Sequence, residues 1–140
     1  GIKTLIILPN NDAGYSNIMN KINDSNISSV NSLSIDDYVN LLKRSEGLIG
    51  NSSSGIHETA TFNIPTINIG TRQQGRLRPE NVIDVDYNKE EIKDAIRLCS
   101  KIKGYTFSNP YGDGKSSEKI VNLLKTVDIS NKIIQKRITY

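Results

Sequence analysis

The most informative stretch of the chain is Gly50-Asn51-Ser52-Ser53-Ser54-Gly55-Ile56-His57-Glu58. It follows a short apolar run at residues 47–49, and residues 55–62 after it have the pattern of a short helix. Where a strand ends in small hydroxyl residues and a helix begins, backbone N–H groups, the positive helix end and serine oxygens face one point. The stretch therefore predicts an anion site of the kind that binds phosphate.

A second polar loop follows the next predicted strand. Residues 65–70 read as that strand, and the loop after it, residues 71–76, contains Arg72 and Arg76. Guanidinium groups bind phosphate with paired hydrogen bonds. Two consecutive strand ends with polar loops indicate that the chain holds a phosphorylated ligand.

Apolar runs alternate with helical patterns along the whole chain. Strands that alternate with helices predict parallel βαβ units in one open α/β sheet, with ligands bound at the carboxyl ends of the strands. The N-caps Ser34, with Asp37, and Asn88, with Glu91, each predict a helix start. The apolar residues expected on the inner face of the first of these helices are Ile35, Tyr38, Val39, Leu41 and Leu42, and those expected on the inner stripe of the second are Ile92, Ala95, Ile96, Cys99 and Ile102. Strands are expected at residues 3–8 (buried), 27–33, 47–50, 65–70 and 81–85, and helices at 15–23, 34–42, 55–62, 88–102 and 128–140.

Composition narrows the class of protein. The 140 residues fit one domain, and the net charge of +3 is scattered, which argues against nucleic acid as a partner. The lone Cys99 excludes a disulfide framework or a cysteine metal site and favours a reducing cytoplasm. The sequence shows no membrane-spanning run and no signal peptide. Because it opens on a strand without an initiator Met, we expect a fragment.

Several polar residues have a structural alternative to a binding role. Asn10 and Asp12 are also ordinary turn formers. Ser52 and Ser53 could cap the following helix, a geometry that does not exclude phosphate binding. Glu58 could offset the helix N-terminus, or it could meet the two hydroxyls of a ribose.

The remaining polar positions divide in the same way. On a helix, the His57 side chain points about 100° away from that of Glu58, so we do not expect both to reach one ligand. We therefore expect a surface or packing role for His57. Arg72 and Arg76 could be ordinary exposed cations, although their place beside a phosphate-type loop favours binding. Tyr111 and Asp113 could form a bare turn or touch a ligand at the rim of the sheet.

Five ordered elements resemble the signature of the hydrolysing UDP-N-acetylglucosamine 2-epimerases. They span nearly the whole chain, and their spacing makes the match specific. The elements are residues 9–14 (Pro-Asn-Asn-Asp-Ala-Gly), 48–58, 64–76, 81–85 and 111–114 (Tyr-Gly-Asp-Gly).

The resemblance implies a two-domain GT-B arrangement in which a C-terminal Rossmann-like domain holds most of the nucleotide. Residues 1–140 are similar to that domain only, without the N-terminal domain and without the first βα unit. The strand at residues 3–8 would then lack one neighbour.

The resemblance also assigns roles to individual residues. Ser52 and Ser53 match the hydroxyls that grip the UDP phosphates. Glu58 matches the carboxylate that binds the ribose, and Arg72 matches the cation beside the nucleotide. Asn10 and Asp12 match residues at the inter-domain cleft. The segment 32–35 matches the loop around the uracil.

The family reaction is elimination of UDP to a 2-acetamidoglucal, followed by hydration to ManNAc. It needs an acid and a base, and the matching residues lie outside this chain, so we expect no catalytic residue here and no turnover by this chain alone. The expected ligand is UDP-GlcNAc or a related UDP-sugar, without cofactor or metal. The resemblance also implies a homodimer or homotetramer of the full-length parent. A GT-B glycosyltransferase domain and a non-catalytic UDP-sugar-binding module remain alternatives.

Overall fold

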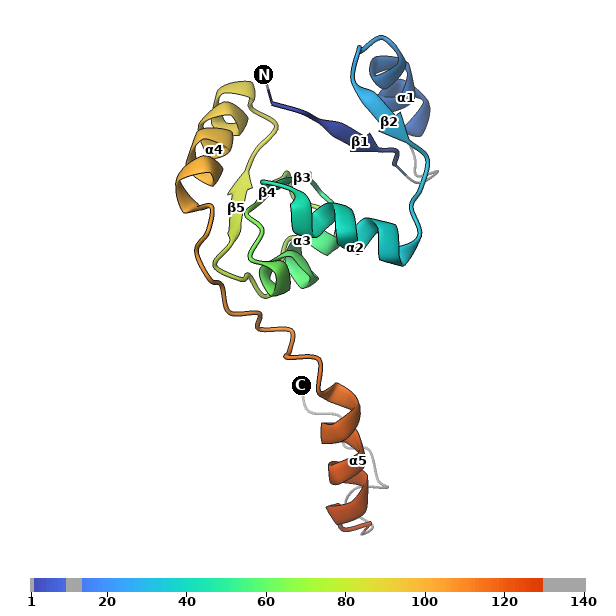
Figure 1. Cartoon of the computed structure of the whole chain (residues 1–140), viewed down its shortest axis with the longest axis vertical. Coiled ribbons are helices and arrows are strands. Elements are labelled where there is room, and N and C mark those ends of the chain that lie inside the picture. The colour runs from blue at the N-terminus through green and yellow to red at the C-terminus, as the bar shows by residue number, and fades with distance from the viewer. Residues whose placement is uncertain (1, 10–13, 130–140) are drawn as a thin grey trace. The chain divides into compact units, whose positions relative to one another are not determined.

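A computed structural model describes residues 2–9 and 14–129 of the chain. The chain divides into two compact units, unit 1 at Gly1–Ser45 and unit 2 at Glu46–Tyr140. Each unit is described by itself, with its helices and strands labelled in Figure 1.

Unit 1 contains a pair of short parallel strands. Its elements are β1 (Leu5–Ile7), α1 (Tyr15–Asn23), β2 (Ser28–Val30) and α2 (Ile35–Arg44). Leu5 of β1 lies opposite Ser28 of β2, and Ile7 lies opposite Val30. A parallel pair needs a crossover connection, and α1 supplies it.

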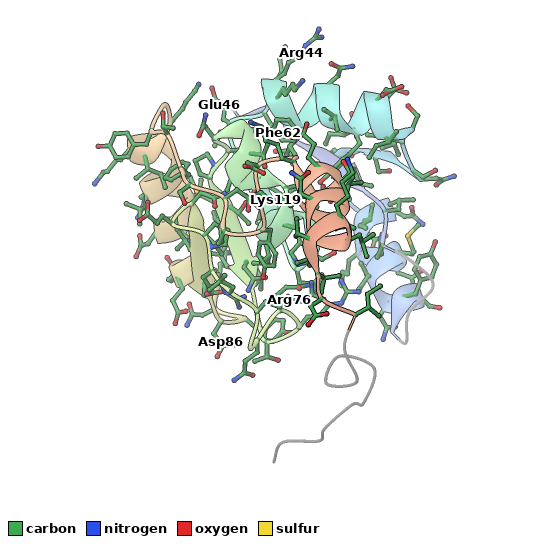
Figure 2. The ribbon with its side chains drawn as sticks, turned by 90° about the horizontal axis from the view of Figure 1, so that it is seen from below. Arg44, Glu46, Phe62, Arg76, Asp86 and Lys119 are labelled. Carbon is green, nitrogen blue, oxygen red and sulfur yellow. The ribbon has the colours of Figure 1, made fainter. Side chains whose placement is uncertain are left out.

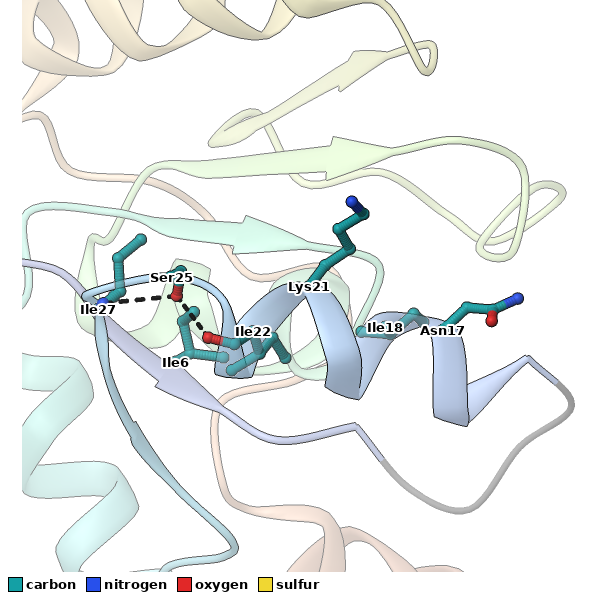
Figure 3. Close-up of a pocket in the computed structure, with 7 residues that line it drawn as sticks. All are labelled: Ile6, Asn17, Ile18, Lys21, Ile22, Ser25 and Ile27. Carbon is teal, nitrogen blue, oxygen red and sulfur yellow. Dashed lines mark hydrogen bonds between the residues drawn. The ribbon is translucent and has the colours of Figure 1, made fainter.

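The prediction that the first strand is buried is wrong. Ile6 faces Ile18 and Ile22 of α1 across a shallow apolar pocket of about 460 Å³, drawn in Figure 3. Leu5 and Ile7 alternate to the other face of the strand, where they stay 40% and 37% exposed. The helix therefore covers only one face of β1.

The cap predicted at Ser34 is confirmed. Its Oγ accepts a hydrogen bond from the Asp37 N–H at 3.1 Å and donates to the Asp37 carboxylate at 2.7 Å. Leu42 is buried on the predicted inner face of α2. Ile35 was also predicted to lie on that face, but it is 71% exposed because it stands at the first residue of the helix, where the apolar stripe ends.

Unit 2 is a three-stranded parallel sheet with helices, in the order β3-β4-β5. The α/β class with parallel strands and flanking helices is thus confirmed, but the described strands form two sheets, because pairing stays within each unit. The elements are β3 (Leu48–Gly50), α3 (Ser54–His57), the 3-10 helix η1 (Thr59–Phe62), β4 (Thr66–Ile69), β5 (Val82–Val85), α4 (Lys89–Ile102) and α5 (Ser116–Thr126).

The apolar core of unit 2 lies between the sheet and α4. Ile67 of β4 packs with Ala95 and Cys99, which belong to the predicted inner stripe of α4. Asn88 caps the helix as predicted, because its side-chain oxygen accepts from the N–H groups of Glu90 and Glu91. Burial raises the pKa of the Cys99 thiol, as expected for a cysteine with a packing role.

A buried polar cluster joins the short helices to the sheet. The side-chain amide of Asn81 donates to Thr59 Oγ1 at 2.8 Å and to the Ile64 carbonyl at 2.6 Å. Thr59 Oγ1 also accepts from Thr66 Oγ1 and donates to the Gly55 carbonyl. The one short helix predicted here is in fact two segments, α3 and η1, with the break at Glu58.

Helix α5 was not predicted, although its apolar residues recur at helical spacing. They are all exposed in the described structure: Ile120, Val121, Leu123 and Leu124. The helix predicted for residues 128–140 falls almost entirely outside the described residues. Within those that are described, no helix has the length and apolar character needed to cross a membrane.

Candidate functional site

Two loops at the carboxyl ends of β3 and β4 are tied together. The Asn51 carbonyl, just after β3, accepts from Gln73 Nε2 at 2.7 Å and from Arg72 Nη1 at 3.3 Å. Figure 2 shows Arg76 and Asp86 at this end of the sheet, with Glu46 and Phe62 toward the other. The serine loop (residues 51–54) and the arginine loop (residues 71–76) therefore form one surface.

The serine loop organises itself around its own hydroxyls. Ser52 Oγ accepts from the Ser54 N–H at 3.3 Å, and Ser54 Oγ donates to Glu58 Oε2 at 2.6 Å. Ser53 occupies the N-cap position of α3 but makes no capping hydrogen bond through its side chain. Because α3 spans only one turn, its dipole adds little positive potential at this end, where the polar side chains are hydroxyls.

Gln73 and Arg78 hold the arginine loop in place, and the sequence interpretation missed both. Gln73 is only 2% exposed, although it lies in a polar loop. Arg78 donates to the Gln73 carbonyl at 2.7 Å and to Asp84 Oδ2 at 2.9 Å. Asp84 also accepts from Asn68 Nδ2, its register partner on β4, at 2.6 Å. Contacts between strands, rather than local pattern, fix these side chains.

The same contacts set the charge state of Asp84. Partial burial pulls the pKa of this carboxyl upward, but hydrogen bonds from Arg78 and Asn68, with the positive charge of Arg78, outweigh it and leave the pKa below its ordinary value. The ion pair between Asp84 and Arg78 therefore persists into acid solution.

We expect Asp84→Asn to lower the free energy of unfolding by about 1 kcal/mol at pH 7, a small value because the pair is partly exposed. A lowered folded-state pKa stabilises the fold above the ordinary carboxyl pKa and ceases to do so as the pH falls through the lowered value. In urea titrations, the difference between variant and wild type should shrink as the pH falls through the lowered pKa of Asp84.

The control for Asp84→Asn is Asp94→Asn, which breaks an exposed pair with Arg97 on α4. It should change stability by about 0.3 kcal/mol or less at pH 7. An Asp84→Asn difference that stays constant as the solution is acidified until the wild type unfolds would contradict the role given to Asp84.

A third loop reaches the serine segment from the end of α4. Asn109 Nδ2 donates to the His57 carbonyl at 2.8 Å and to Thr61 Oγ1 at 2.7 Å. Tyr111 stacks at a tilt against the His57 ring, with centroids 4.4 Å apart, and its hydroxyl donates to the Leu77 carbonyl. Arg76 Nη1 lies 2.8 Å from His57 Nε2. His57 thus has the packing role predicted for it.

Asp113 takes part in local structure in this loop. Its Oδ1 accepts from the Lys115 N–H and from Lys119 Nζ, both at 3.1 Å. These hydrogen bonds, together with the charge of Lys119, lower the pKa of the Asp113 carboxyl. The turn reading of Asp113 therefore accounts for its contacts in the described structure.

Four of the six predicted binding residues lie in unit 2. Ser52 and Ser53 stand on the serine loop, Glu58 directly follows α3, and Arg72 stands on the loop tied to the serine loop. The other two, Asn10 and Asp12, lie outside the described residues. Among the residues that the structure describes, no group of three or more His, Cys, Asp or Glu side chains could hold a metal ion.

Known proteins resemble the chain along nearly its whole length. The model of the UDP-N-acetylglucosamine 2-epimerase family matches residues 1–125. A UDP-N,N'-diacetylbacillosamine 2-epimerase (hydrolyzing) from Legionella pneumophila is 35% identical over 139 residues, which cover 96% of this chain and 37% of that protein. A UDP-N-acetylglucosamine 2-epimerase from Neisseria meningitidis is 29% identical, with 98% of this chain and 38% of that protein covered.

A solved structure agrees with these relatives. The UDP-GlcNAc 2-epimerase from Methanocaldococcus jannaschii superposes with a TM-score of 0.62 at 25% identity, over 78% of this chain and 31% of that one. The chain thus spans well under half the length of the relatives it matches. The match over residues 1–125 shows that the chain belongs to the UDP-N-acetylglucosamine 2-epimerase family.

Proposed function

We propose that this chain supplies the UDP-binding part of a hydrolysing UDP-sugar 2-epimerase. The observation that carries the proposal is the junction at the Asn51 carbonyl, which holds the arginine loop against the serine loop. Hydroxyls and a guanidinium on one surface are the groups that bind a diphosphate. In this proposal Ser52 and Ser53 bind the phosphates of UDP, and Arg72 lies beside them.

Glu58 is the proposed contact for the ribose. Its Oε2 accepts from Ser54 Oγ, which holds the carboxylate beside the serine loop. A carboxylate can accept hydrogen bonds at both oxygens, so Glu58 can receive the two ribose hydroxyls while Ser54 keeps its bond. Asn10 and Asp12 complete the proposed binding set at the cleft to a second domain.

The proposed reaction is elimination of UDP from the sugar and hydration of the product with inversion at C2. The names of the two sequence relatives share UDP and differ in the sugar, N-acetylglucosamine in one and N,N'-diacetylbacillosamine in the other. This supports UDP as the part of the substrate that this chain binds. We place the enzyme in the cytoplasm, as a homodimer or homotetramer of a longer parent.

Calorimetric titration of the chain with UDP tests the proposal. Ser53→Ala and Arg72→Ala should each weaken binding by about 1.5–3 kcal/mol, because each removes a hydrogen bond to a charged group. The matched controls are Ser117→Ala on α5 and Arg97→Ala on α4, both exposed and both in unit 2. We expect the controls to bind UDP like the wild type. Equal affinity in all five proteins would contradict the assignment.

A further inference from the structure

The contact between Arg76 and His57 defines the protonation of the ring. Arg76 Nη1 and His57 Nε2 lie 2.8 Å apart. A guanidinium can only donate, so Nε2 must accept, and the ring must be neutral with its proton on Nδ1. A protonated ring has donors at both nitrogens and carries a charge that repels Arg76. The contact can therefore exist only while His57 is neutral.

This contact joins the arginine loop to the helix that follows the serine loop, at a second place beside the Asn51 junction. His57 is the last residue of α3, the helix that the serine loop opens, and Glu58 follows it directly. Arg76 lies four residues after Arg72 on the arginine loop, whose turn is closed by the bond from the Gln74 N–H to the Thr71 carbonyl. The position of Arg72 relative to the serines thus depends on both junctions.

Groups from two other loops contact the ring in the described structure. Arg76 approaches from the loop after β4 and Tyr111 from the loop after α4. On its own segment the neighbour is Glu58, whose carboxylate accepts from Ser54. Asp113, beyond Tyr111, is paired with Lys119. Arg76 is therefore the only charged group among these for which a polar contact with the ring is observed.

We propose that His57 is a positioning residue for the nucleotide. Its neutral ring holds Arg76, and with it the loop that carries Arg72, against the helix that follows the phosphate-binding serines. The inference rests on the proposed function and adds that binding of the UDP moiety weakens when the ring gains a proton. Binding is therefore compared on the two sides of the pH range in which histidine side chains ordinarily change charge.

The first test measures the affinity of the chain for UDP-GlcNAc at pH 8 and pH 5.5. This ligand is the right probe because its diphosphate is esterified at both ends and lacks the terminal phosphate ionisation near pH 6. Wild type should bind about three- to tenfold more weakly at pH 5.5, the equivalent of one hydrogen bond. In His57→Gln the ratio should stay below about twofold, because the amide oxygen accepts from Arg76 without titrating.

The second test reads the ring directly. His57 is the only histidine, so its imidazole nitrogens give unambiguous signals in a long-range ¹H–¹⁵N correlation spectrum. At pH 8 we expect an unprotonated, accepting Nε2 in the free chain. A proton on Nε2 would overturn the role of His57, and so would a wild-type affinity ratio near one or an unchanged ratio in His57→Gln.

The two tests separate this inference from the proposed function. Absence of UDP-GlcNAc binding at pH 8 would overturn the proposed function and the role of His57 with it. Binding at pH 8 together with a protonated Nε2 would overturn the role of His57 alone.

Discussion

Replacing Asn81 with alanine should lower the free energy of unfolding by about 2–4 kcal/mol, the range for a buried hydrogen-bonded residue. Asn81 is 0% exposed, and its amide serves both Thr59 Oγ1 and the Ile64 carbonyl. The variant leaves the buried carbonyl without that donor and opens a cavity. Most domains of this size have only about 5–15 kcal/mol of stability in total. Urea denaturation at pH 7 measures the loss.

Two further variants show whether the donor group is the cause. Asn81→Asp keeps the shape of the side chain but replaces the amide donor with a charged acceptor. Because Thr59 Oγ1 and the Ile64 carbonyl both need a donor there, this variant should be more destabilising than Asn81→Ala at pH 7. Asn122→Ala on the exposed face of α5 should change stability by less than about 0.5 kcal/mol. A loss below about 1 kcal/mol in Asn81→Ala would contradict the role of this cluster.

Gly55→Ala should destabilise the chain by about 1–3 kcal/mol, the usual cost of overpacking. Helix propensity alone predicts the opposite, a gain of about 0.5–1 kcal/mol. A Cβ at Gly55 would lie 2.6 Å from Thr66 Cγ2, which is far too close. Thr66 is buried and bonded to Thr59 Oγ1, so it cannot turn aside without losing that hydrogen bond. Thermal and urea unfolding of the variant show whether the substitution lowers or raises the stability.

The contacting methyl group can be removed on its own. Thr66→Ser deletes Cγ2 and keeps the hydroxyl that bonds to Thr59. In the double variant Gly55→Ala/Thr66→Ser, the loss should be smaller than the sum of the two single losses by about 1 kcal/mol or more. Strict additivity would show that the close approach is not the source of the effect.

Features that depend on neighbours in sequence were predictable. The caps at Ser34 and Asn88, the inner stripe of α4 and the succession of parallel strands all follow from spacing within a few residues, and all are confirmed. Four proposed binding residues were singled out for a similar reason, since they stand where strands end. Their role in binding stays a prediction.

Features that depend on tertiary contacts were not predictable. Gln73 lies in a stretch that reads as an exposed loop, yet it is buried because the Asn51 carbonyl and Arg78 meet it from other parts of unit 2. The break between α3 and η1 comes where Thr59 bonds to Asn81, twenty-two positions away. For α5 the helical period was present in the sequence, but Lys115 at its N-cap makes no side-chain capping bond and so marks no start.

The order of strands in unit 2 has a consequence for how this part of the chain folds. Each strand pairs with the next one along the chain, with register partners Leu48 and Thr66, then Thr66 and Val82. Only the segments 51–65 and 70–81 have to close before these pairings form, and the entropy of closure grows slowly with loop length. The sheet can therefore assemble progressively from one edge to the other, with a lower contact order than a parallel sheet whose neighbouring strands are distant in the sequence.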